Sequence, residues 1–588
     1  MRPWRCYARL LRPYWDLAVA APLCMGLEVC TTLNQPRLVR RIIDVGVAHS
    51  DMGVVLHTGL EMIGLTFLGM VGALGCLTTT VTVVQRFGRD LRDQLFRKVQ
   101  RLSFSDLDRL ETGSLITRLT NDVQQVQDAL TMVLRHGVRI CSTLVGSLIM
   151  AAVTSPKLAV IFLFLVPAVF GLLAFVIRRS QPLFAGVQKR LDRLNTVLRE
   201  NLGGVRVVRV FARGPHEIAR FSEANGDLAE QNIAAARLGA TTLPLANLAL
   251  HFAIVAAVAL GGFHLHKGNL EVGQVVAFIT YLTQTLNALV MTSALTMQFS
   301  RAQVSSRRVV EVLDLPDDRP ESALITPDRV QGRIEFQNVT FSYRPGAQEP
   351  VLRNLSFVVE PGQTVAIIGA TGAGKSTLVA LIAGFYRPSA GRITLDGVDL
   401  GQLDDQVLRG HIAIAMQEAI LFGGTIRDNI RYGRPDASDD DVLAAAVAAQ
   451  AHGFIDALPE GYDAPVLKRG VNLSGGQRQR LSLARALLLR ARVLILDDST
   501  SAVDVHTEAR IRQALAAQKE KQSRIIVAQS IASIRDADQI LVLDDGQLVG
   551  AGTHAELLQG NRIYQEIFAS QEQRVSDHGT FAADRSVN

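Results

Sequence analysis

Six stretches of this 588-residue chain almost lack charged side chains, and they constrain its fold more than any other feature. They cover residues 17–36, 62–85, 140–156, 158–177, 238–266 and 272–300, and only Glu28 interrupts them. A helix that crosses the hydrocarbon core of a bilayer needs about 20 mostly apolar residues. A buried helix of a soluble protein explains one such run, but not six in the first half of a chain. The sequence therefore predicts a polytopic membrane protein.

The basic residues predict how these spans are oriented. We place the spans at about 17–36, 62–85, 137–156, 158–177, 240–263 and 274–298, within a transmembrane domain of residues 1–311. Lys and Arg are concentrated in residues 1–16, 86–139, 178–237 and 301–308. They are sparse in the segments on the opposite side of the membrane, residues 37–61, 154–157 and 264–274. Basic loops favour the cytoplasmic side, so we expect both termini there. The formal net charge of +6 then reflects membrane orientation, and we expect no nucleic-acid partner.

The two longest basic loops, 87–139 and 178–237, contain apolar residues at helical spacing, such as Leu91, Leu95 and Val99. This patterning predicts that the membrane helices continue beyond the bilayer as amphipathic rods. Gly113 and the pair Gly203-Gly204 would interrupt these rods and permit a turn. At each break the residues fit a short docking segment and a solvated hairpin equally well.

The composition changes after the last span. Residues 312–332 include Pro316, Pro320 and Pro327 among acidic residues and show no apolar period, which predicts a linker. Beyond it, apolar strands at 333–343, 364–369 and 493–497 alternate with helical stretches, a pattern typical of an α/β domain. We assign this domain to residues 333–570 and expect the polar tail 571–588 to be disordered.

A phosphate-binding loop of the form GxxxxGK[ST] follows the strand at 364–369 and precedes an apolar helical stretch. In such a loop the glycines let backbone N–H groups wrap the phosphates, the lysine neutralises the outer phosphates, and the next hydroxyl can bind Mg²⁺. The residues predicted to bind the nucleotide are Gly369, Ala370, Thr371, Gly372, Ala373, Gly374, Lys375, Ser376 and Thr377.

Two further segments fit the same chemistry. The strand at 493–497 ends in Asp497, which would hold Mg²⁺ or its water, and Asp498 follows at the position of a residue that orients or activates water. A turn at Ser474-Gly475-Gly476 precedes a helical stretch, and its free N–H groups would suit a phosphate. Its shape alone fits an ordinary glycine turn that caps a helix equally well.

Residues 473–477 read LSGGQ, which is the signature of ABC-transporter ATPases. Together with the phosphate loop, it makes the chain resemble an exporter-type ABC half-transporter, over 1–311 for the six-helix domain and 333–570 for the nucleotide-binding domain. The resemblance implies ATP and Mg²⁺ as ligands and ATP-driven export by alternating access. Residues 104–122 and 201–213 are similar to the family's two intracellular loops, which favours the docking segments.

The resemblance also implies roles for single residues. Tyr343 would stack on adenine, Gln417 would meet Mg²⁺ and sense the phosphate, and Asp504 would communicate across a dimer. Mg²⁺ would be held by Ser376, Gln417 and Asp497. The signature residues that would contact the ATP of a partner are Ser474, Gly475, Gly476 and Gln477.

Two positions depart from the family pattern. The catalytic glutamate is replaced by Asp498, and the switch histidine by Gln529. Aspartate is one methylene shorter, and a misplacement of about 1 Å can cost on the order of 10²-fold in rate. Glutamine cannot donate as an imidazolium or shuttle a proton. The sequence therefore predicts a site that binds ATP and hydrolyses it poorly.

The family builds each ATP site from one chain's phosphate loop and the other chain's signature. An intact signature beside an impaired carboxylate predicts a heterodimer, in which a different half-transporter supplies the glutamate and the histidine. A homodimer with slow hydrolysis and an importer built on the same fold are the alternatives. We expect the transporter in the inner membrane of a bacterium, surrounded by membrane lipid.

The transported substrate is not evident from the sequence, which allows a small molecule, a lipid or a peptide. Polar groups within spans are costly and often mark function, although they also join helices by hydrogen bonds. The candidates for a substrate cavity are Glu28, Asn247, His251, Gln284 and Asn287.

Overall fold

The computed structural model describes residues 3–318, 325–327, 329–344, 349–517 and 522–571. These described residues form two units, one within 1–100 and 111–315 and the other within 101–110 and 316–571. The predicted tail 571–588 lies, except for its first residue, outside the described residues.

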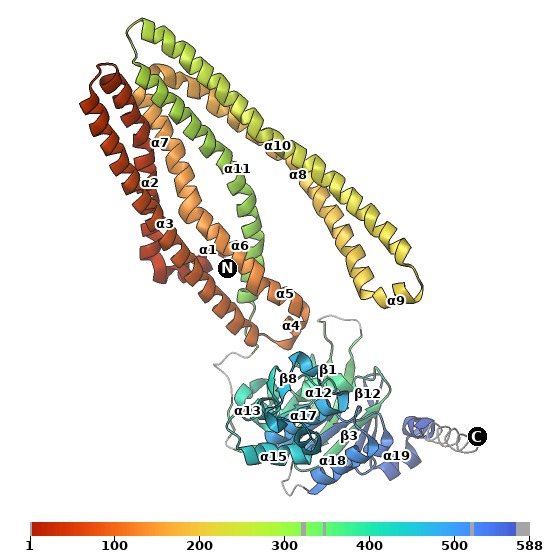
Figure 1. The fold of residues 1–588 in the computed structure, drawn as a ribbon. Helices are drawn as coiled ribbons and strands as arrows, with labels where there is room; N and C mark the ends of the chain where they lie inside the picture. Colours follow the sequence, from red (N-terminus) through yellow and green to blue (C-terminus); the bar gives the residue numbers. More distant parts are fainter. Residues whose placement is uncertain (1–2, 319–324, 328, 345–348, 518–521, 572–588) are drawn as a thin grey trace. The chain divides into compact units, whose positions relative to one another are not determined.

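Long helices make up the first unit (Figure 1). Within the described residues, six helices are long and apolar enough to cross a membrane, which confirms the prediction of six spans. At about 1.5 Å per residue, the 49 residues of α3 extend well beyond the hydrocarbon core of about 30 Å. The main element of each spanning helix is, in chain order, α2 (Trp15–Arg41), α3 (Met52–Gln100), α7 (Val138–Thr154), α8 (Pro156–Gly203), α10 (Gly214–His266) and α11 (Val272–Asp314).

Shorter helical elements connect these rods. They are α1 (Pro3–Leu11), η1 (Arg12–Tyr14), η2 (Ile42–Val47), α5 (Thr112–Thr117), η3 (Arg118–Asp122), α6 (Val123–Thr131), η4 (Met132–Gly137) and α9 (Val205–Val210). The break predicted at Gly203-Gly204 is present, because α8 ends there and α9 begins. The break predicted at Gly113 is wrong. Gly113 lies inside α5, and the chain turns instead at Glu111, whose φ of 54° ends the preceding helix.

Small residues and hydroxyls bring the rods together. A Cβ at Gly69 would lie 2.5 Å from the Thr31 hydroxyl, and one at Gly72 would lie 2.9 Å from the Cys24 carbonyl, so α3 approaches α2 closely. The hydroxyl of Tyr281 on α11 donates to the Leu33 carbonyl at 2.9 Å. Polar groups of the spans therefore do serve in part to join helices.

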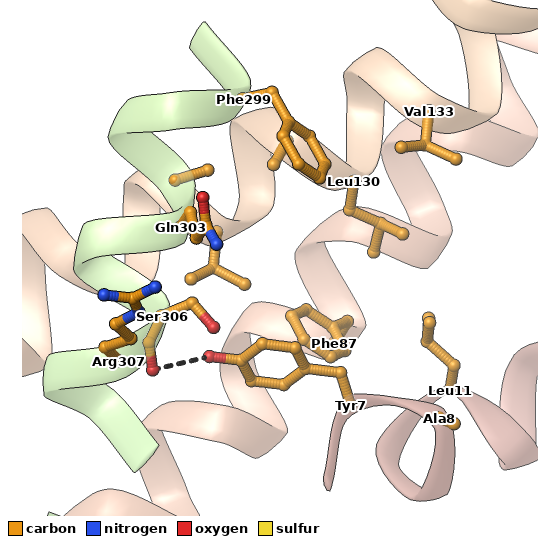
Figure 2. Close-up of a pocket in the computed structure, with 13 residues that line it drawn as sticks. Tyr7, Ala8, Leu11, Phe87, Leu130, Val133, Phe299, Gln303, Ser306 and Arg307 are labelled. Atoms are coloured by element: carbon orange, nitrogen blue, oxygen red, sulfur yellow. Dashed lines mark hydrogen bonds between the residues drawn. The ribbon is translucent and has the colours of Figure 1, made fainter. Parts of the chain in front are cut away.

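The helix α1 packs against the far end of α11. The Tyr7 hydroxyl donates to the Ser306 carbonyl at 3.4 Å, and the ring of Tyr7 lies edge-on to Phe87 of α3 (Figure 2). Between α1, α3, α6 and α11 lies a largely apolar cavity of about 510 Å³. The rod α11 continues to Asp314, three residues past the predicted domain boundary, because its apolar period continues through the buried Val309, Val310 and Val312.

Two sheets form the core of the second unit. Strands in the order β12-β11-β3-β10-β9-β6 make a six-stranded sheet, parallel except at β12, and β2-β1-β4-β5 make an antiparallel sheet. The strands are β1 (Ile334–Phe341), β2 (Leu352–Val359), β3 (Thr364–Gly369), β4 (Ala390–Leu395), β5 (Val398–Asp399), β6 (Ile412–Ala415), β7 (Gly424–Thr425), β8 (Pro465–Val466), β9 (Val493–Asp497), β10 (Ser523–Val527), β11 (Gln539–Asp544) and β12 (Gln547–Gly552). The predicted α/β domain is confirmed.

The helices of this unit surround the sheets. They are α4 (Phe104–Leu110), α12 (Lys375–Ile382), α13 (Asp405–His411), α14 (Ile426–Arg431), α15 (Asp439–Ala448), α16 (His452–Asp456), α17 (Gly475–Leu488), α18 (Val505–Ala517) and α19 (His554–Gly560), with short 3₁₀ turns η6 (Leu400–Gln402), η7 (Gly461–Asp463), η8 (Lys468–Gly470) and η9 (Ile531–Ser533). Strands β3, β10 and β9 are neighbours and parallel, so the segments that follow them meet at one edge.

Candidate nucleotide site

The phosphate loop follows the buried strand β3 and leads into α12. Gly372 and Gly374 have φ values of 91° and 95°, which a residue with a Cβ rarely adopts. A Cβ at Gly374 would also lie 2.6 Å from Leu352. The ammonium group of Lys375 donates to the carbonyls of Gly369 and Ala370 at 2.8 Å each. The loop therefore has the backbone shape and the cation that a phosphate chain requires.

Tyr343 lies just beyond the end of β1. Its ring is 47% exposed, and its hydroxyl forms a 3.0 Å hydrogen bond with that of Thr377 on α12. The exposed ring lies beside the phosphate loop, in a position suitable for the stacking on a base that the resemblance implies.

Asp497 ends β9 and Asp498 follows it, and both carboxylates lie near Lys375 of the phosphate loop. Burial raises the pKa of Asp497, and the neighbouring Asp498 carboxylate raises it further. Burial also raises the pKa of Asp498 and lowers that of Lys375. A cation between the carboxylates and the phosphates would relieve this cost. Ser376, Gln417 and Asp497 offer hydroxyl, amide and carboxylate oxygens, the ligand types that Mg²⁺ prefers, so the residues present fit this ion.

Two glutamines hold the Asp498 carboxylate. The amide of Gln529 donates to its Oδ2 atom at 2.9 Å, and the amide of Gln417 donates to the same atom at 3.3 Å. The backbone of Asp498 has a φ of 47°, and its N–H donates to the Val527 carbonyl at 3.0 Å. The structure thus brings together the two positions at which the sequence departs from the family pattern.

The signature turn caps α17. Ser474 accepts a hydrogen bond from the Gln477 backbone at 3.2 Å, and the Gln477 side chain accepts one from the Ser474 N–H at 2.9 Å. A Cβ at Gly476 would lie 2.7 Å from the Ala502 carbonyl, so this turn packs tightly on the loop before Asp504. Asp504 in turn caps α18 by accepting from the Thr507 N–H at 2.9 Å.

Sequence reasoning missed Gln479, which joins these two segments. Its buried side chain donates to the Ser501 hydroxyl at 3.1 Å and accepts from the Ala502 N–H at 2.9 Å. The available signal was a glutamine on the apolar face of the predicted helix, because a buried amide needs hydrogen-bond partners.

Arg485 was also missed. Its guanidinium donates to the carbonyls of Ile420 and Asn429 at 3.0 and 2.9 Å, and it lies over the rings of Phe422 and Tyr432. It fixes the segment that follows Gln417.

The short helix α4 is part of the second unit by its contacts. The ring of Phe104 stacks on Phe385 with centroids 4.4 Å apart, and the hydroxyl of Tyr386 donates to Asp108. Burial, and then the Asp108 carboxylate, raise the pKa of Tyr386 above its ordinary value, which keeps the phenol a donor. The sequence allowed either a docking segment or a solvated hairpin in the loop that contains α4. The contacts of α4 with Phe385 and Tyr386 support the docking segment.

Of the five predicted cavity residues, the structure brings together two. Glu28 of α2 and Gln284 of α11 line one cavity of about 450 Å³. The other three do not line it. They are Asn247 and His251 on α10, which are joined at 2.6 Å through the Asn247 carbonyl, and the exposed Asn287.

Comparison with known proteins decides the family. Residues 20–289 match the family model for the ABC transporter transmembrane region, and residues 352–501 match the family model for the ABC transporter. The uncharacterized ABC transporter ATP-binding protein YfiB of Bacillus subtilis is 41% identical over 561 residues, covering 95% of this chain and 97% of that protein. The chain belongs to the ABC transporter family. It combines an exporter-type membrane domain with an ATP-binding, ATP-hydrolysing domain, and ABC exporters function as dimers.

Two further relatives are named for what they move, and one solved structure matches the whole fold. The ATP-dependent lipid A-core flippase of Chromobacterium violaceum is 33% identical over 572 residues, 97% of each chain. A fatty acid ABC transporter ATP-binding/permease protein of Mycobacterium bovis is 38% identical over 491 residues, 84% of this chain and 76% of that protein. A solved bacterial Atm1-family ABC exporter with ATP bound matches with a TM-score of 0.80 and 28% identity, over 95% of this chain and 98% of that one.

Proposed function

We propose that this ABC transporter chain is the hydrolysis-impaired subunit of a heterodimeric exporter. The observation that carries the proposal is the pair of hydrogen bonds from Gln529 and Gln417 to one oxygen of Asp498. A general base must reach the attacking water, and a carboxylate that is one methylene shorter and is held at its Oδ2 atom by two amides has only Oδ1 left to accept a proton and little freedom to move toward the water.

Gln529 adds a second impairment. An amide can donate to a phosphate oxygen, but it cannot carry the positive charge of an imidazolium or transfer a proton. The two losses act at the same site, so they need not add as independent terms. Both nevertheless lower hydrolysis, while the phosphate loop and Tyr343 retain the features that bind ATP.

The well-formed signature turn supports a partner chain. Ser474, Gly476 and Gln477 are fixed by a capping box and by close packing on Ala502. In this family such a turn would complete the ATP site of the other subunit. We therefore infer a second half-transporter with an intact glutamate and histidine, which hydrolyses ATP at the competent site.

The proposed cycle uses both sites. ATP bound by Lys375 and the rest of the phosphate loop would favour closure of the two ATPase domains, and α4 would transmit it to the membrane helices. Mg²⁺, held by Ser376, Gln417 and Asp497, would neutralise charge on the phosphates. Positive-inside loops support a cytoplasmic location for the termini and the ATPase domain, in the inner membrane of a bacterium.

For the substrate we propose an amphiphilic molecule that reaches the transporter from the membrane. The similar flippase and fatty acid transporter are named for lipids. The apolar cavity beside α1 offers about 510 Å³ of space, with Gln303 and Arg307 among its lining residues (Figure 2). Its lining residues lie beyond the predicted spans, on the cytoplasmic side, so the cavity could take the alkyl chain of a molecule that leaves the membrane there. Ligand pockets commonly span about 300–1,000 Å³.

The nucleotide that remains bound tests the proposal. The chain purified alone in lipid nanodiscs is incubated with Mg-ATP, separated from free nucleotide, and analysed for retained ATP and ADP. We expect the wild type to retain ATP, and a chain with Asp498→Glu and Gln529→His to retain ADP. A wild-type chain that retains ADP within one turnover of a typical ATPase contradicts the proposal. Lys375→Ala, which should retain neither nucleotide, is the control.

A further inference from the structure

We propose that the apolar cavity beside α1 binds an amphiphile with an anionic head group, and that Arg307 of α11 holds this head group. The cavity has about 510 Å³ and lies between α1, α3, α6 and α11, within the first unit. Its apolar walls accept an alkyl chain, and its polar residues determine which head group can accompany that chain.

One face of α11 forms a wall of the cavity and supplies most of its polar side chains. The lining residues of this helix follow the i, i+3, i+4, i+7, i+8 pattern of a single helical face. They are Phe299, Ala302, Gln303, Ser306 and Arg307. Along this face the side chains change from an aromatic ring, at the end nearer the predicted span 274–298, to an amide and a guanidinium farther from it.

The end of the cavity nearer the predicted spans is apolar. Figure 2 shows Phe299 and Val133 at this end, and Ser306 and Arg307 at the other. Val133 and Phe299 are 52% and 40% exposed, although both are apolar. An alkyl chain that enters from the bilayer would cover these two side chains, and burial of apolar surface favours binding.

Arg307 brings a positive charge that the chain does not neutralise. Of the described residues that line the cavity, only Arg307 is charged, and its guanidinium forms no ion pair or hydrogen bond within the described part of the chain. The neighbouring acidic residues have other partners. Glu311 pairs with Arg118 at 2.9 Å, and Asp122 pairs with Arg308 at 3.7 Å. Arg307 is therefore available to an anion from outside the chain.

Gln303 lies one turn before Arg307 on the same face. Its amide also forms no hydrogen bond within the described residues, so its nitrogen can donate to an oxygen of the same head group. A guanidinium offers parallel N–H donors that match a carboxylate or a phosphate, and it repels an ammonium group. The polar end of the cavity thus favours an anionic head group over a neutral or cationic one.

The order of polarity matches an amphiphile of the cytoplasmic leaflet. Its chain would lie toward the bilayer, at Phe299 and Val133, and its head group would lie toward the cytoplasm, at Arg307. Because the inference rests on the proposed export function, the bound molecule would be the transported amphiphile.

Photolabelling of the full chain in nanodiscs tests the inference. Four probes share one hexadecyl chain with a diazirine near its end and differ in the head group, which is a carboxylate, a phosphate monoester, a hydroxyl or an ammonium group. The pH is mildly alkaline, so that both acids are ionised. Mass spectrometry quantifies labelling of the peptides that contain Val133 and Phe299. It is divided by labelling near Phe164, an exposed residue of α8 that does not line the cavity, so that partition into lipid cancels.

We expect one or both anionic probes to give about fivefold more normalised labelling than the hydroxyl and ammonium probes, as an exposed ion pair allows. Preference for the phosphate identifies a phosphate monoester, and equal or stronger labelling by the carboxylate identifies a fatty acid. Both results support the anionic head group.

Variants at Arg307 test its role directly. Arg307→Gln should abolish the preference, and Arg307→Glu should transfer it to the ammonium probe. Arg179→Gln is the matched control and should leave the preference unchanged, because Arg179 is exposed on α8 just beyond a predicted span and does not line the cavity. Ala129→Phe fills the cavity without changing its charge and should lower labelling by the anionic probes severalfold.

Equal normalised labelling by the four probes would overturn the inference. So would an anionic preference that persists in Arg307→Gln, or that Arg179→Gln removes to the same extent. Retained nucleotide is measured on the same preparations. A wild-type chain that hydrolyses ATP rapidly refutes the proposed function without changing the head-group preference, so the two failures are distinguishable.

Discussion

Replacing Phe104 by alanine removes the aromatic contact that holds α4 on the ATPase unit. The ring stacks on Phe385 at 4.4 Å and is 37% exposed, so close to two-thirds of the residue is covered. Covering that share of a phenylalanine contributes about 1–2 kcal/mol, and a stacked pair adds about 0.5–1.5 kcal/mol. The expected loss is about 2 kcal/mol. It corresponds to roughly 30-fold more frequent local opening of α4.

Amide hydrogen exchange of residues 104–110, measured on the full chain in nanodiscs, tests this estimate. Exchange of the α4 amides should accelerate about 30-fold in Phe104→Ala, while strands β3 and β9 keep their protection. Phe96→Ala is the matched control, since Phe96 is 56% exposed on α3. Unchanged exchange of α4 in Phe104→Ala, or equal acceleration in the control, would refute the reasoning that this ring docks the helix.

Three further predictions concern the nucleotide site and its supports. Gly476→Ala places a Cβ 2.7 Å from the Ala502 carbonyl and should lower the thermal midpoint of the ATPase domain. Gly475→Ala, whose Cβ would have its nearest neighbour at 3.5 Å, should be tolerated. Equal midpoints for the two variants would contradict the tight packing at Gly476. Tyr343→Ala should weaken ATP binding about tenfold or more through lost stacking, while Tyr343→Phe keeps it, as measured with a fluorescent ATP analogue. Gln479→Leu should destabilise the chain by about 1–3 kcal/mol in denaturant titrations, because it leaves the Ala502 N–H without its partner; no change would contradict that role.

The sequence predicted the elements that carry strong local signals. Strands β3 and β9 have the predicted bounds, because each is an apolar run that ends where a motif of the nucleotide site begins, at Gly369 and at Asp497. The six spans were likewise evident, since a bilayer requires length and apolarity that a soluble protein rarely repeats. The phosphate loop needs glycines at fixed positions, so its motif alone located it.

Contacts between distant segments could not be predicted in this way. The break assigned to Gly113 occurs at Glu111, an exposed non-glycine residue at positive φ, and no residue type at that position signals the turn. The hydrogen bond from Gln529 to Asp498 joins the segments that follow β10 and β9, and no local pattern indicates which side chains form hydrogen bonds beyond neighbouring strands. Of five intramembrane polar residues, only the geometry separates Glu28 and Gln284, which share a cavity, from the rest.

ATP turnover by the purified chain in lipid tests the central claim most directly. The wild type is compared with the Asp498→Glu, Gln529→His double variant and with Lys375→Ala, and binding of ATP is confirmed in the first two. The account predicts negligible wild-type turnover and a gain on the order of 10²-fold in the double variant. Brisk wild-type turnover that disappears in Lys375→Ala would show that Asp498 suffices as a base, and the claim of a hydrolysis-impaired subunit would be wrong.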